Sequence, residues 1–272
     1  MEFRPLHPDF GIEVTGFDVV NGRAQADIDQ LVRAYDEHSM LLFRGAPRIS
    51  HERHVEIASW FGPPGPVDNG GDGQFVSVLH NDELAGSMYL PFHSDLTYTD
   101  DPVRAICLQA IELPGKPTAT TYVSNCAAWM SLPPELQELL ADKTMRHFYH
   151  SRAGFDWPDF IAEHPMRFTH PRTGGPLLLV TEMHANRILE MDEEESRATI
   201  DTLFTYLYAP ERRYTHVWQL NDVLMWDNLV LQHSRQEEAE PADGPRALQR
   251  VALSNLTLQQ TIDMARARKA AA

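Results

Sequence analysis

The sequence predicts an α+β protein with an antiparallel β core, folded as a barrel or as a double-sheet jelly roll. Short strand-like segments dominate its centre and its C-terminal third, whereas helical stripes occur early and between those segments. This distribution is typical of antiparallel β architectures with attached helices. Strict alternation of strand and helix is absent, and so is a G-x-G-x-x-G turn, which argues against a doubly wound parallel sheet.

Length and composition indicate one globular unit. The chain has 272 residues, of which 43% are hydrophobic, and no low-complexity linker divides it, so we expect a single domain over residues 1–272. Two cysteines are too few for a disulfide framework, and the N-terminus lacks the pattern of a signal peptide. No apolar run approaches the roughly 20 residues of a membrane span. These features predict a soluble cytoplasmic protein.

The charge of the chain limits its partners. Lys and Arg number 23 against 39 Asp and Glu, which gives a net charge of −16. A strongly acidic chain repels nucleic acid and anionic membranes, so we expect a small-molecule partner and neither of these. The acidic runs at residues 192–195 and 237–240 are typical of solvated loops and helix starts.

The N-terminal part predicts two helices and a buried strand. Residues 26–37 place apolar side chains at helical spacing, and residues 39–45 form an apolar, strand-like run. Ser50 is placed to cap a second helix, which ends near Trp60 before the segment Gly-Pro-Pro-Gly. Four glycines lie in or beside residues 66–73, which we expect to form a loop and a mobile lid.

The remainder predicts two further helices among short strands. Helical stripes recur over residues 136–140 and 200–207. The strand-like segments are residues 104–108, 177–180, 214–220, 223–226, 229–233 and 247–253.

A histidine and an aspartate stand two positions apart in the stretch FHSDLT at residues 92–97. On an extended strand, residues i and i+2 point to the same face, so His93 and Asp95 can reach a single point. An imidazole and a carboxylate that meet at one point form two thirds of a metal site. The pair alone is a weak signal, because the third ligand must come from elsewhere.

His233 is the candidate for the third ligand. It follows a predicted turn at Asp227 and Asn228 and shares a strand face with Leu229 and Leu231. A histidine that continues an apolar face needs a hydrogen-bonding partner or a metal, and a satisfied core histidine is the alternative. Most other histidines are expected to be structural. Six lie in polar or loop contexts and are expected at the surface: His7, His38, His51, His54, His164 and His170.

Two arginines share one face of the last predicted strand. Arg246 and Arg250 alternate with Leu248, and guanidinium groups on the face of a β core each need an anion. Their backbones are roughly 13 Å apart along a strand, so one carboxylate cannot easily serve both. Salt bridges to the acidic surface are the alternative to a ligand.

These residues together match one kind of chemistry. Two histidines and a carboxylate bind one face of an octahedral iron(II) and leave three positions open. A 2-oxo acid can chelate two of those positions while an arginine binds its far carboxylate in a forked pair, and dioxygen takes the last. The ordered set is therefore a much stronger signal than any of its parts.

The chain resembles the TauD/TfdA family of iron(II)- and 2-oxoglutarate-dependent dioxygenases nearly from end to end. The resemblance is carried by FGIEVTG at residues 10–16, LLFRG at 41–45, WFG at 60–62, HSD at 93–95, VLMWDN at 223–228 with His233, and PRALQRV at 245–251. Phe92 stands where the family has the tryptophan of W-H-x-D, and Asn221-Asp222 stands in the place of its G-D pair.

The resemblance implies a role for each matching residue. Arg246 matches the arginine that anchors the distal carboxylate of 2-oxoglutarate. Thr120 matches a hydroxyl that assists this arginine, with Thr121 as the alternative because residues 117–119 depart from the family pattern. A double-stranded β-helix core and a homo-oligomer, either a dimer or a tetramer, are also implied. The iron ligands are matched by His93, Asp95 and His233.

The substrate is less well indicated than the cosubstrate. Arg250 matches an arginine near both 2-oxoglutarate and an acidic group of the substrate, so we expect an acidic substrate. His80, Asn81 and Tyr89 border the metal motif and are candidates for the substrate pocket. Ordinary loop positions are the alternative for these three residues.

The activity implied is the oxidative decarboxylation of 2-oxoglutarate to succinate and CO2, with dioxygen, coupled to hydroxylation of a C–H bond in a small organic substrate. Asp95 supplies the carboxylate that non-haem halogenases lack. A zinc or manganese hydrolase on the same ligands is an alternative, but it leaves Arg246 and Thr120 without a purpose. A non-catalytic jelly-roll binding module is another, and the intact triad argues against it.

Overall fold

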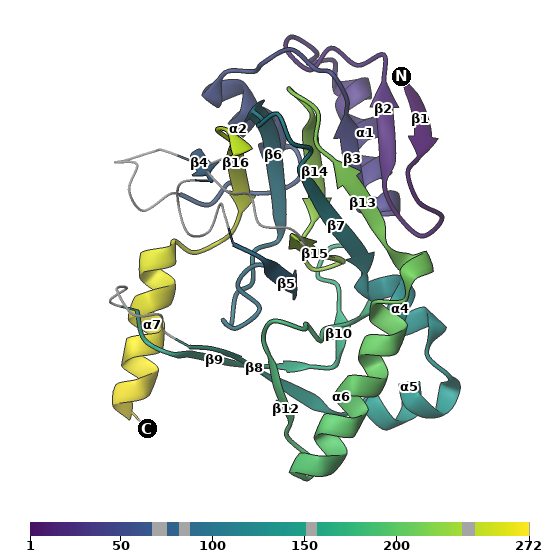
Figure 1. The fold of residues 1–272 in the computed structure, drawn as a ribbon, viewed down its shortest axis with the longest axis vertical. Helices are drawn as coiled ribbons and strands as arrows, with labels where there is room; N and C mark the ends of the chain where they lie inside the picture. Colours follow the sequence, from purple (N-terminus) through teal and green to yellow (C-terminus); the bar gives the residue numbers. More distant parts are fainter. Residues whose placement is uncertain (67–74, 82–87, 151–156, 236–242, 272) are drawn as a thin grey trace.

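The computed structural model describes residues 1–66, 75–81, 88–150, 157–235 and 243–271. Within these residues, a large and a small β-sheet form the centre of the molecule, and helices lie around them (Figure 1). This is the predicted jelly-roll core with attached helices. None of the helices in the described part of the chain is long and apolar enough to cross a membrane.

The large sheet has seven strands, and all its pairs are antiparallel except β2 with β3. Its strands, in spatial order, are β1 (Glu2–Pro5), β2 (Ile12–Thr15), β3 (Met40–Phe43), β14 (Val223–Asp227), β6 (Ala105–Glu112), β16 (Ala247–Leu253) and β4 (Ser77–His80). β6 and β16 pair over their whole lengths, with Arg250 opposite Leu108. β16, which carries Arg250 and begins directly after Arg246, therefore lies inside the sheet.

The small sheet has four strands and carries the histidine motif. In spatial order they are β13 (Tyr214–Val217), β7 (Ala119–Ser124), β15 (Leu231–Arg235) and β5 (Leu90–His93). Two further sheets lie beside it. One consists of β12 (Ala185–Ile188), β8 (Thr144–Tyr149) and β9 (Phe160–Pro165), and the other of β10 (Arg167–Thr169) and β11 (Pro176–Leu178).

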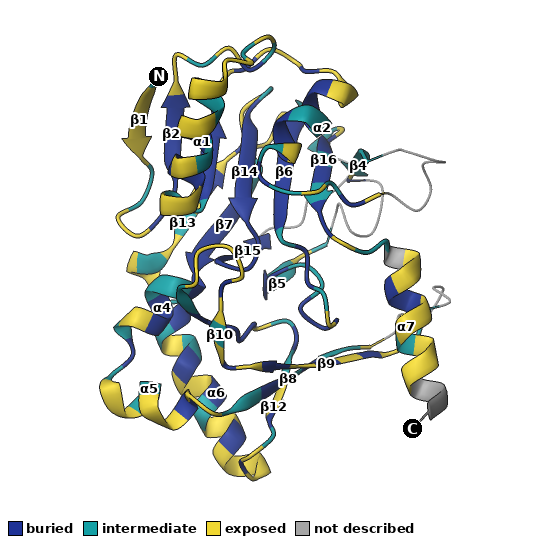
Figure 2. Cartoon of the chain, turned by 180° about the vertical axis from the view of Figure 1, so that it is seen from behind, coloured by how far each residue is buried: buried dark blue, intermediate teal, exposed yellow. Residues whose placement is uncertain are grey.

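The large and small sheets enclose one apolar core. Leu42, Ile106 and Leu248 of the large sheet pack in one cluster with Tyr122 and Leu231 of the small sheet. The burial colours show this packing, since the central strands are almost entirely buried (Figure 2). The two sheets therefore form a sandwich, and its inner faces hold the site residues described below.

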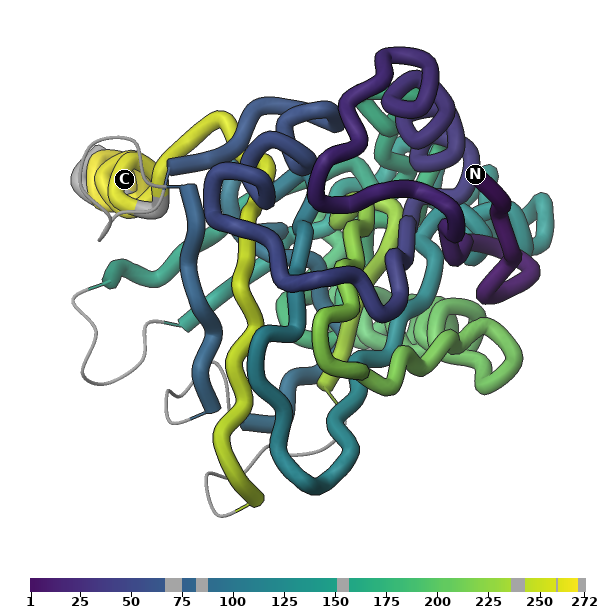
Figure 3. Tube along the Cα trace, turned by 90° about the horizontal axis from the view of Figure 1, so that it is seen from above, coloured from purple at the N-terminus to yellow at the C-terminus, as the bar shows by residue number. Residues whose placement is uncertain are grey.

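Helices lie around this sandwich, and two of them pack on its large sheet. The helices are α1 (Gln25–His38), α2 (His51–Ser59), α4 (Asn125–Ser131), α5 (Pro134–Leu140), α6 (Glu193–Leu207) and α7 (Leu258–Ala271), with a short 3-10 turn at Pro210–Arg212. α1 and α2 bury Leu31 and Ile57 in a cluster that includes Val251 of the large sheet. α7 lies on the side of the molecule opposite to the N-terminus (Figure 3).

Most predicted elements are confirmed with small changes at their ends. α1 extends the predicted helix by one residue at each end, and β16 has the predicted bounds. Ser50 caps α2, because its side chain accepts a hydrogen bond from the backbone N–H of Arg53 at 3.2 Å. Residues 67–73 of the predicted lid and the acidic residues 237–240 lie outside the described residues.

The prediction of six surface histidines is wrong for half of them. His54, His164 and His170 are buried. Each has a polar partner inside the protein: Gln249 for His54, backbone carbonyls for His164, and the carboxylate of Asp227 for His170. Polar neighbours in the sequence did not reveal these partners, because they come from segments far away along the chain.

Candidate active site

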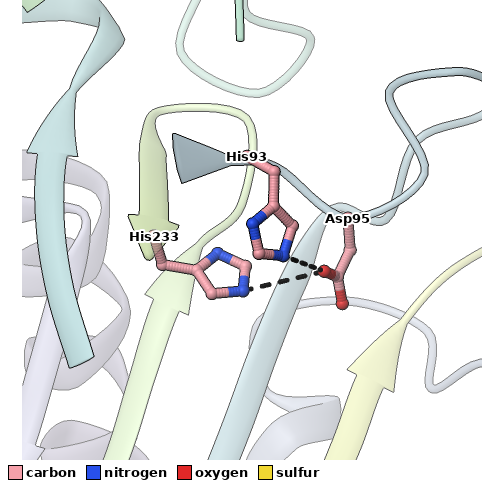
Figure 4. Close-up of side chains that lie close together, drawn as sticks. All are labelled: His93, Asp95 and His233. Carbon is pink, nitrogen blue, oxygen red and sulfur yellow. Dashed lines mark ion pairs between the residues drawn. The ribbon is translucent and has the colours of Figure 1, made fainter. Parts of the chain in front are cut away.

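Strand pairing brings the two histidines of the predicted site together. β5 pairs with β15 so that His93 lies opposite His233, and their rings are 4.3 Å apart between centroids. Both side chains point toward Asp95 (Figure 4). The third ligand that the sequence placed 140 positions away is therefore a direct neighbour of the first.

Asp95 is held by a turn and not by a strand. β5 ends at His93, so the expectation that both residues share a strand face is wrong in its geometry, although it identified the correct pair. Asn228 fixes the turn with two hydrogen bonds: its Oδ1 accepts from the Asp95 N–H at 2.9 Å, and its Nδ2 donates to the Asp95 carbonyl at 3.2 Å. Leu96 then takes a left-handed φ of 60°, a conformation that is uncommon outside glycine.

The three side chains present their ligand atoms to one point. Oδ1 of Asp95 is 3.4 Å from Nε2 of His93 and 3.7 Å from Nε2 of His233, and all three ligand atoms lie within 4.8 Å of one another. Nδ1 of His93 is 2.8 Å from the Pro91 carbonyl. A carbonyl only accepts, so this nitrogen carries the ring proton and leaves the Nε2 lone pair free for a metal.

The protonation states also suit a divalent cation. Burial lowers the pKa of His233 to about 3, so its ring is neutral at physiological pH. Burial opposes ionisation of Asp95, but its hydrogen bond with His93 and the charge of Arg250 hold the pKa of this carboxyl well below its ordinary value. A neutral imidazole and an ionised carboxylate are the forms that bind metal.

The candidate ligands line a cavity of about 430 Å³ together with Arg246 and Thr120. Arg246 is only 3% exposed, and its side chain forms no hydrogen bond or ion pair with the part of the chain that the structure describes. Burial, with a smaller effect of Arg235, lowers the pKa of Arg246 to about 10, so it remains a cation at neutral pH. A buried, unpaired guanidinium beside a cavity calls for an anionic ligand.

The structure separates the two threonine candidates. Thr120 lines the cavity, and its hydroxyl accepts a hydrogen bond from Nε1 of Trp218 at 3.0 Å. Thr121 points to the other face of β7, where its hydroxyl lies 3.0 Å from that of Thr215. Because Trp218 donates to the Thr120 oxygen, the hydroxyl proton of Thr120 is left to donate elsewhere.

Arg250 has an anionic partner inside the protein. Its Nη2 donates to Oδ2 of Asp95 at 2.8 Å. Arg250 therefore has a protein carboxylate as one partner, and the acidic substrate expected near it stays a prediction. Asp95 uses one oxygen toward the histidines and the other toward Arg250.

None of the three further substrate candidates lines the cavity. His80 is exposed at the end of β4, and Tyr89 is 40% exposed. Asn81 is buried and holds the backbone of Arg246, since its Oδ1 accepts from the Arg246 N–H at 3.0 Å and its own N–H donates to the Arg246 carbonyl. Substrate contact by these residues stays a prediction.

Sequence reasoning missed several residues around the site. Asn228 was interpreted only as a turn residue, although it fixes Asp95, and Trp218 was assigned only to a strand. Arg235 and His184 also line the cavity. Arg235 lies two positions after His233 on the same strand, so the period of two could have indicated it.

Comparison with known proteins identifies the family of this chain. The family model of the taurine catabolism dioxygenase TauD, TfdA family matches residues 2–252. The chain is 25% identical to pentalenolactone F synthase of Streptomyces avermitilis, with 83% of this chain and 85% of that protein covered. It is also 25% identical to the alpha-ketoglutarate-dependent 2,4-dichlorophenoxyacetate dioxygenase of Cupriavidus pinatubonensis, with 84% and 90% covered.

Solved structures agree with the fold. A taurine dioxygenase from Burkholderia xenovorans superposes with a TM-score of 0.79 at 24% identity, covering 93% of this chain and 90% of that one. AAD-2, solved in complex with Mn(II) and N-oxalylglycine, superposes with a TM-score of 0.77 at 20% identity, covering 93% and 98%. Because the family match extends over nearly the whole chain, this protein belongs to the TauD/TfdA family of 2-oxoglutarate-dependent dioxygenases.

Proposed function

We propose that the protein is an iron(II) enzyme that hydroxylates a C–H bond of a small organic substrate while it converts 2-oxoglutarate to succinate and CO2. One observation carries this proposal. A two-histidine, one-carboxylate cluster shares a cavity with a buried arginine whose side chain has no hydrogen-bond or ion-pair partner among the described residues. The first feature suits a divalent metal with open positions, and the second suits a carboxylate-bearing cosubstrate.

The residues present fit the metal. His93 and His233 would each bind it through Nε2, and Asp95 would bind it through Oδ1. Iron bound there would supply the activation of dioxygen. The protein's own contribution is to fix the ligands: the Pro91 carbonyl orients the His93 ring, and Asn228 orients Asp95.

Arg246, directly before β16, and Thr120 of β7 fit the cosubstrate. Arg246 would bind the distal carboxylate of 2-oxoglutarate in a forked pair, which would satisfy the Nε atom that now lacks a hydrogen bond. Thr120 would donate its hydroxyl proton to the same carboxylate, because Trp218 already occupies its oxygen. Asn81 would keep the Arg246 backbone in place.

A metal-dependent hydrolase is the rival function on the same ligands. A hydrolase needs a bound water and no second anion, so it would leave Arg246 buried and uncompensated, at a cost of several kcal/mol. The unpaired Arg246 therefore favours the dioxygenase.

The test is succinate formation by the purified protein. We expect succinate to form only when iron(II), 2-oxoglutarate and dioxygen are all present. Succinate should form faster when a member of a substrate panel is added that the protein hydroxylates. Replacement of iron by zinc should abolish succinate formation. Zinc-supported hydrolysis without 2-oxoglutarate would contradict the proposal.

A further inference from the structure

A second cavity lies next to the active-site cavity, and Tyr98 belongs to the walls of both. This outer cavity, of about 640 Å³, is lined by residues of β9 and α7 that include Phe160, Ile161 and Met264. Among the residues that the structure describes, Tyr98 is the one shared by the two linings. A smaller cavity of about 240 Å³ is lined by Tyr98 as well. Tyr98 therefore limits the space beside the metal ligands on the side that faces α7.

Strand β9 holds the backbone on both sides of Tyr98. Nε2 of His164 lies 3.0 Å from the carbonyl oxygens of Thr97 and of Thr99. A carbonyl only accepts, so this nitrogen carries the ring proton and donates to both of the residues that flank Tyr98. The hydroxyl of Thr99 also donates to the Leu96 carbonyl at 2.7 Å. The backbone at Tyr98 is therefore fixed by a strand of another sheet as well as by its own turn.

The ring of Tyr98 is held by aromatic neighbours and by helix α7. It stacks on Tyr149 of β8 with the centroids 4.6 Å apart, and it lies 5.3 Å from the ring of Phe160 of β9. Ile262 of α7 is buried in the same apolar cluster as Tyr98 and Phe160. The ring is thus packed against β8, β9 and α7 at once.

Helix α7 is attached both to β9 and to the loop that carries Tyr98, which we call the β5–β6 loop (residues 94–104). Arg268 of α7 donates from Nη1 to the Ile161 carbonyl of β9 at 2.9 Å and forms an ion pair with Asp100 of the loop. The family model matches residues 2–252, and α7 begins at Leu258. The helix that supports Tyr98 therefore lies beyond the part of the chain that the family model matches.

We propose that Tyr98 sets the size limit of the substrate space on the side of α7 by separating it from the outer cavity, and that α7 and β9 hold Tyr98 in place. This inference rests on the proposed function. With Tyr98 present, 2-oxoglutarate and the substrate share a cavity of about 430 Å³, which suits a small substrate. Without its side chain, the active-site cavity would continue into the outer cavity, where Phe160 and Ile161 would pack against the apolar end of a longer substrate.

The size limit is tested with compounds of one and two rings: phenylacetate and 2-phenylethanol, and 4-biphenylacetate and 2-(4-biphenylyl)ethanol. The use of an acid and an alcohol of each size makes the test independent of the charge of the substrate. The protein is loaded with Mn(II) and N-oxalylglycine, and each Kd comes from the broadening of the compound's proton signals by Mn(II), which detects molecules bound near the metal.

We expect Tyr98→Ala to bind at least one two-ring compound about tenfold more tightly than the wild type does, because the second ring would bury apolar surface in the outer cavity. The one-ring compounds should gain nothing. Met264→Ala is the matched control, since it enlarges the outer cavity without opening it, and it should bind all four compounds as the wild type does. No gain in Tyr98→Ala, or an equal gain in Met264→Ala, would overturn the size limit.

The support from α7 is tested by amide hydrogen exchange, which requires no ligand. The β5–β6 loop contains protected amides, such as the N–H of Thr99, which donates to the Leu96 carbonyl at 3.0 Å. We expect Ile262→Ala to speed exchange in this loop about threefold or more, because it removes packing from the loop. Met264→Ala changes a side chain of the same helix that is 48% exposed, and it should leave the exchange unchanged. Equal exchange in the two variants would overturn the role of α7.

The support from β9 is tested in the same way. His164→Leu should also speed exchange in the β5–β6 loop, and His164→Gln, whose side-chain amide retains a donor, should recover part of the protection. Wild-type exchange in His164→Leu would overturn the role of β9. A wild type that binds neither Mn(II) nor N-oxalylglycine would instead contradict the proposed function, and the exchange rates would still decide whether α7 and β9 hold Tyr98.

Discussion

Asp95 connects the metal site to the rest of the protein, because Asn228 fixes its backbone and Arg250 fixes its outer oxygen. We expect Asp95→Ala to abolish succinate formation and to weaken metal binding by at least a hundredfold. His93→Ala and His233→Ala should have the same effect, while the fold is retained because all three side chains border a cavity. The measurements are metal affinity and thermal unfolding of the metal-free proteins. Full activity in Asp95→Ala would contradict the assignment of the ligands.

Arg246 tests the cosubstrate assignment. Removing a buried, forked arginine–carboxylate pair costs on the order of 2 to 5 kcal/mol, so Arg246→Gln should raise the KM for 2-oxoglutarate by tens- to thousands-fold. Steady-state kinetics at saturating iron(II) measure this change. A near-normal KM would move the anchoring role to Arg235 or Arg250.

Trp218 acts through Thr120 in this account. Trp218→Phe removes the N–H that occupies the Thr120 oxygen, so the hydroxyl proton is no longer directed. We expect the KM for 2-oxoglutarate to rise about threefold to tenfold, since a hydrogen bond of this kind contributes roughly 0.5 to 1.5 kcal/mol. Trp129→Phe is the control, because Trp129 is equally buried in a different core cluster. If both variants had the same KM for 2-oxoglutarate, Trp218 would contribute to packing and not to the orientation of Thr120.

The residue types of the site could be predicted from the sequence, but their contacts could not. His93, Asp95, His233 and Arg246 stand in motifs whose chemistry is recognisable when they are taken together in their order along the chain. The partner of Arg250 depends on a turn after β5 that turns Asp95 toward β16, and no local pattern encodes that approach. The role of Asn81 was hidden for the same reason, because it depends on pairing between β4 and β16.

At the scale of elements, helix α2 offers a direct test of a sequence signal. Ser50 caps this helix, which packs Ile57 and Ala58 against the large sheet. Ser50→Ala should lower the free energy of unfolding by about 1 kcal/mol, and Ser50→Asp should retain it, because aspartate caps as well as serine does. Urea unfolding of the three proteins measures this difference. Equal stability of the wild type and Ser50→Ala would show that the cap is unimportant here.

Periodic elements were predictable, and short or turn-interrupted ones were less so. α1 and β16 carry clear apolar repeats and were predicted to within a residue. The strand predicted over residues 229–233 begins only at Leu231, because Oδ1 of Asp227 accepts hydrogen bonds from the N–H groups of Leu229 and Val230 and prolongs the turn. β5 is four residues long, too short for a periodic signal.

At the scale of the whole molecule, buried histidines make stability depend on pH. Burial lowers the pKa of His54 to about 4, and it lowers that of His147 well below the ordinary value. In the unfolded chain both rings take up a proton near pH 6.5, whereas the folded protein keeps them neutral. The contribution of these neutral rings to the free energy of unfolding is therefore fully present above about pH 6.5. It is lost progressively as the pH falls toward 4.

Each such histidine should lower the free energy of unfolding at pH 5.5 by on the order of 1 to 2 kcal/mol relative to pH 7.5. Urea unfolding at the two values measures this loss, and His54→Gln should reduce it. His51→Gln is the control, since His51 is exposed at the start of the same helix. Equal stability of the wild type at pH 5.5 and pH 7.5 would contradict the claim that the folded protein keeps these buried histidines neutral.

The central claim is that one cavity holds iron(II) through His93, Asp95 and His233 and 2-oxoglutarate through Arg246. An anaerobic titration of the iron(II)-loaded protein with 2-oxoglutarate tests it most directly. We predict a weak visible charge-transfer band in the wild type, no band in Asp95→Ala, and saturation only at much higher 2-oxoglutarate in Arg246→Gln. A wild type that binds both iron(II) and 2-oxoglutarate without any band, or a band that survives Asp95→Ala unchanged, would contradict the claim.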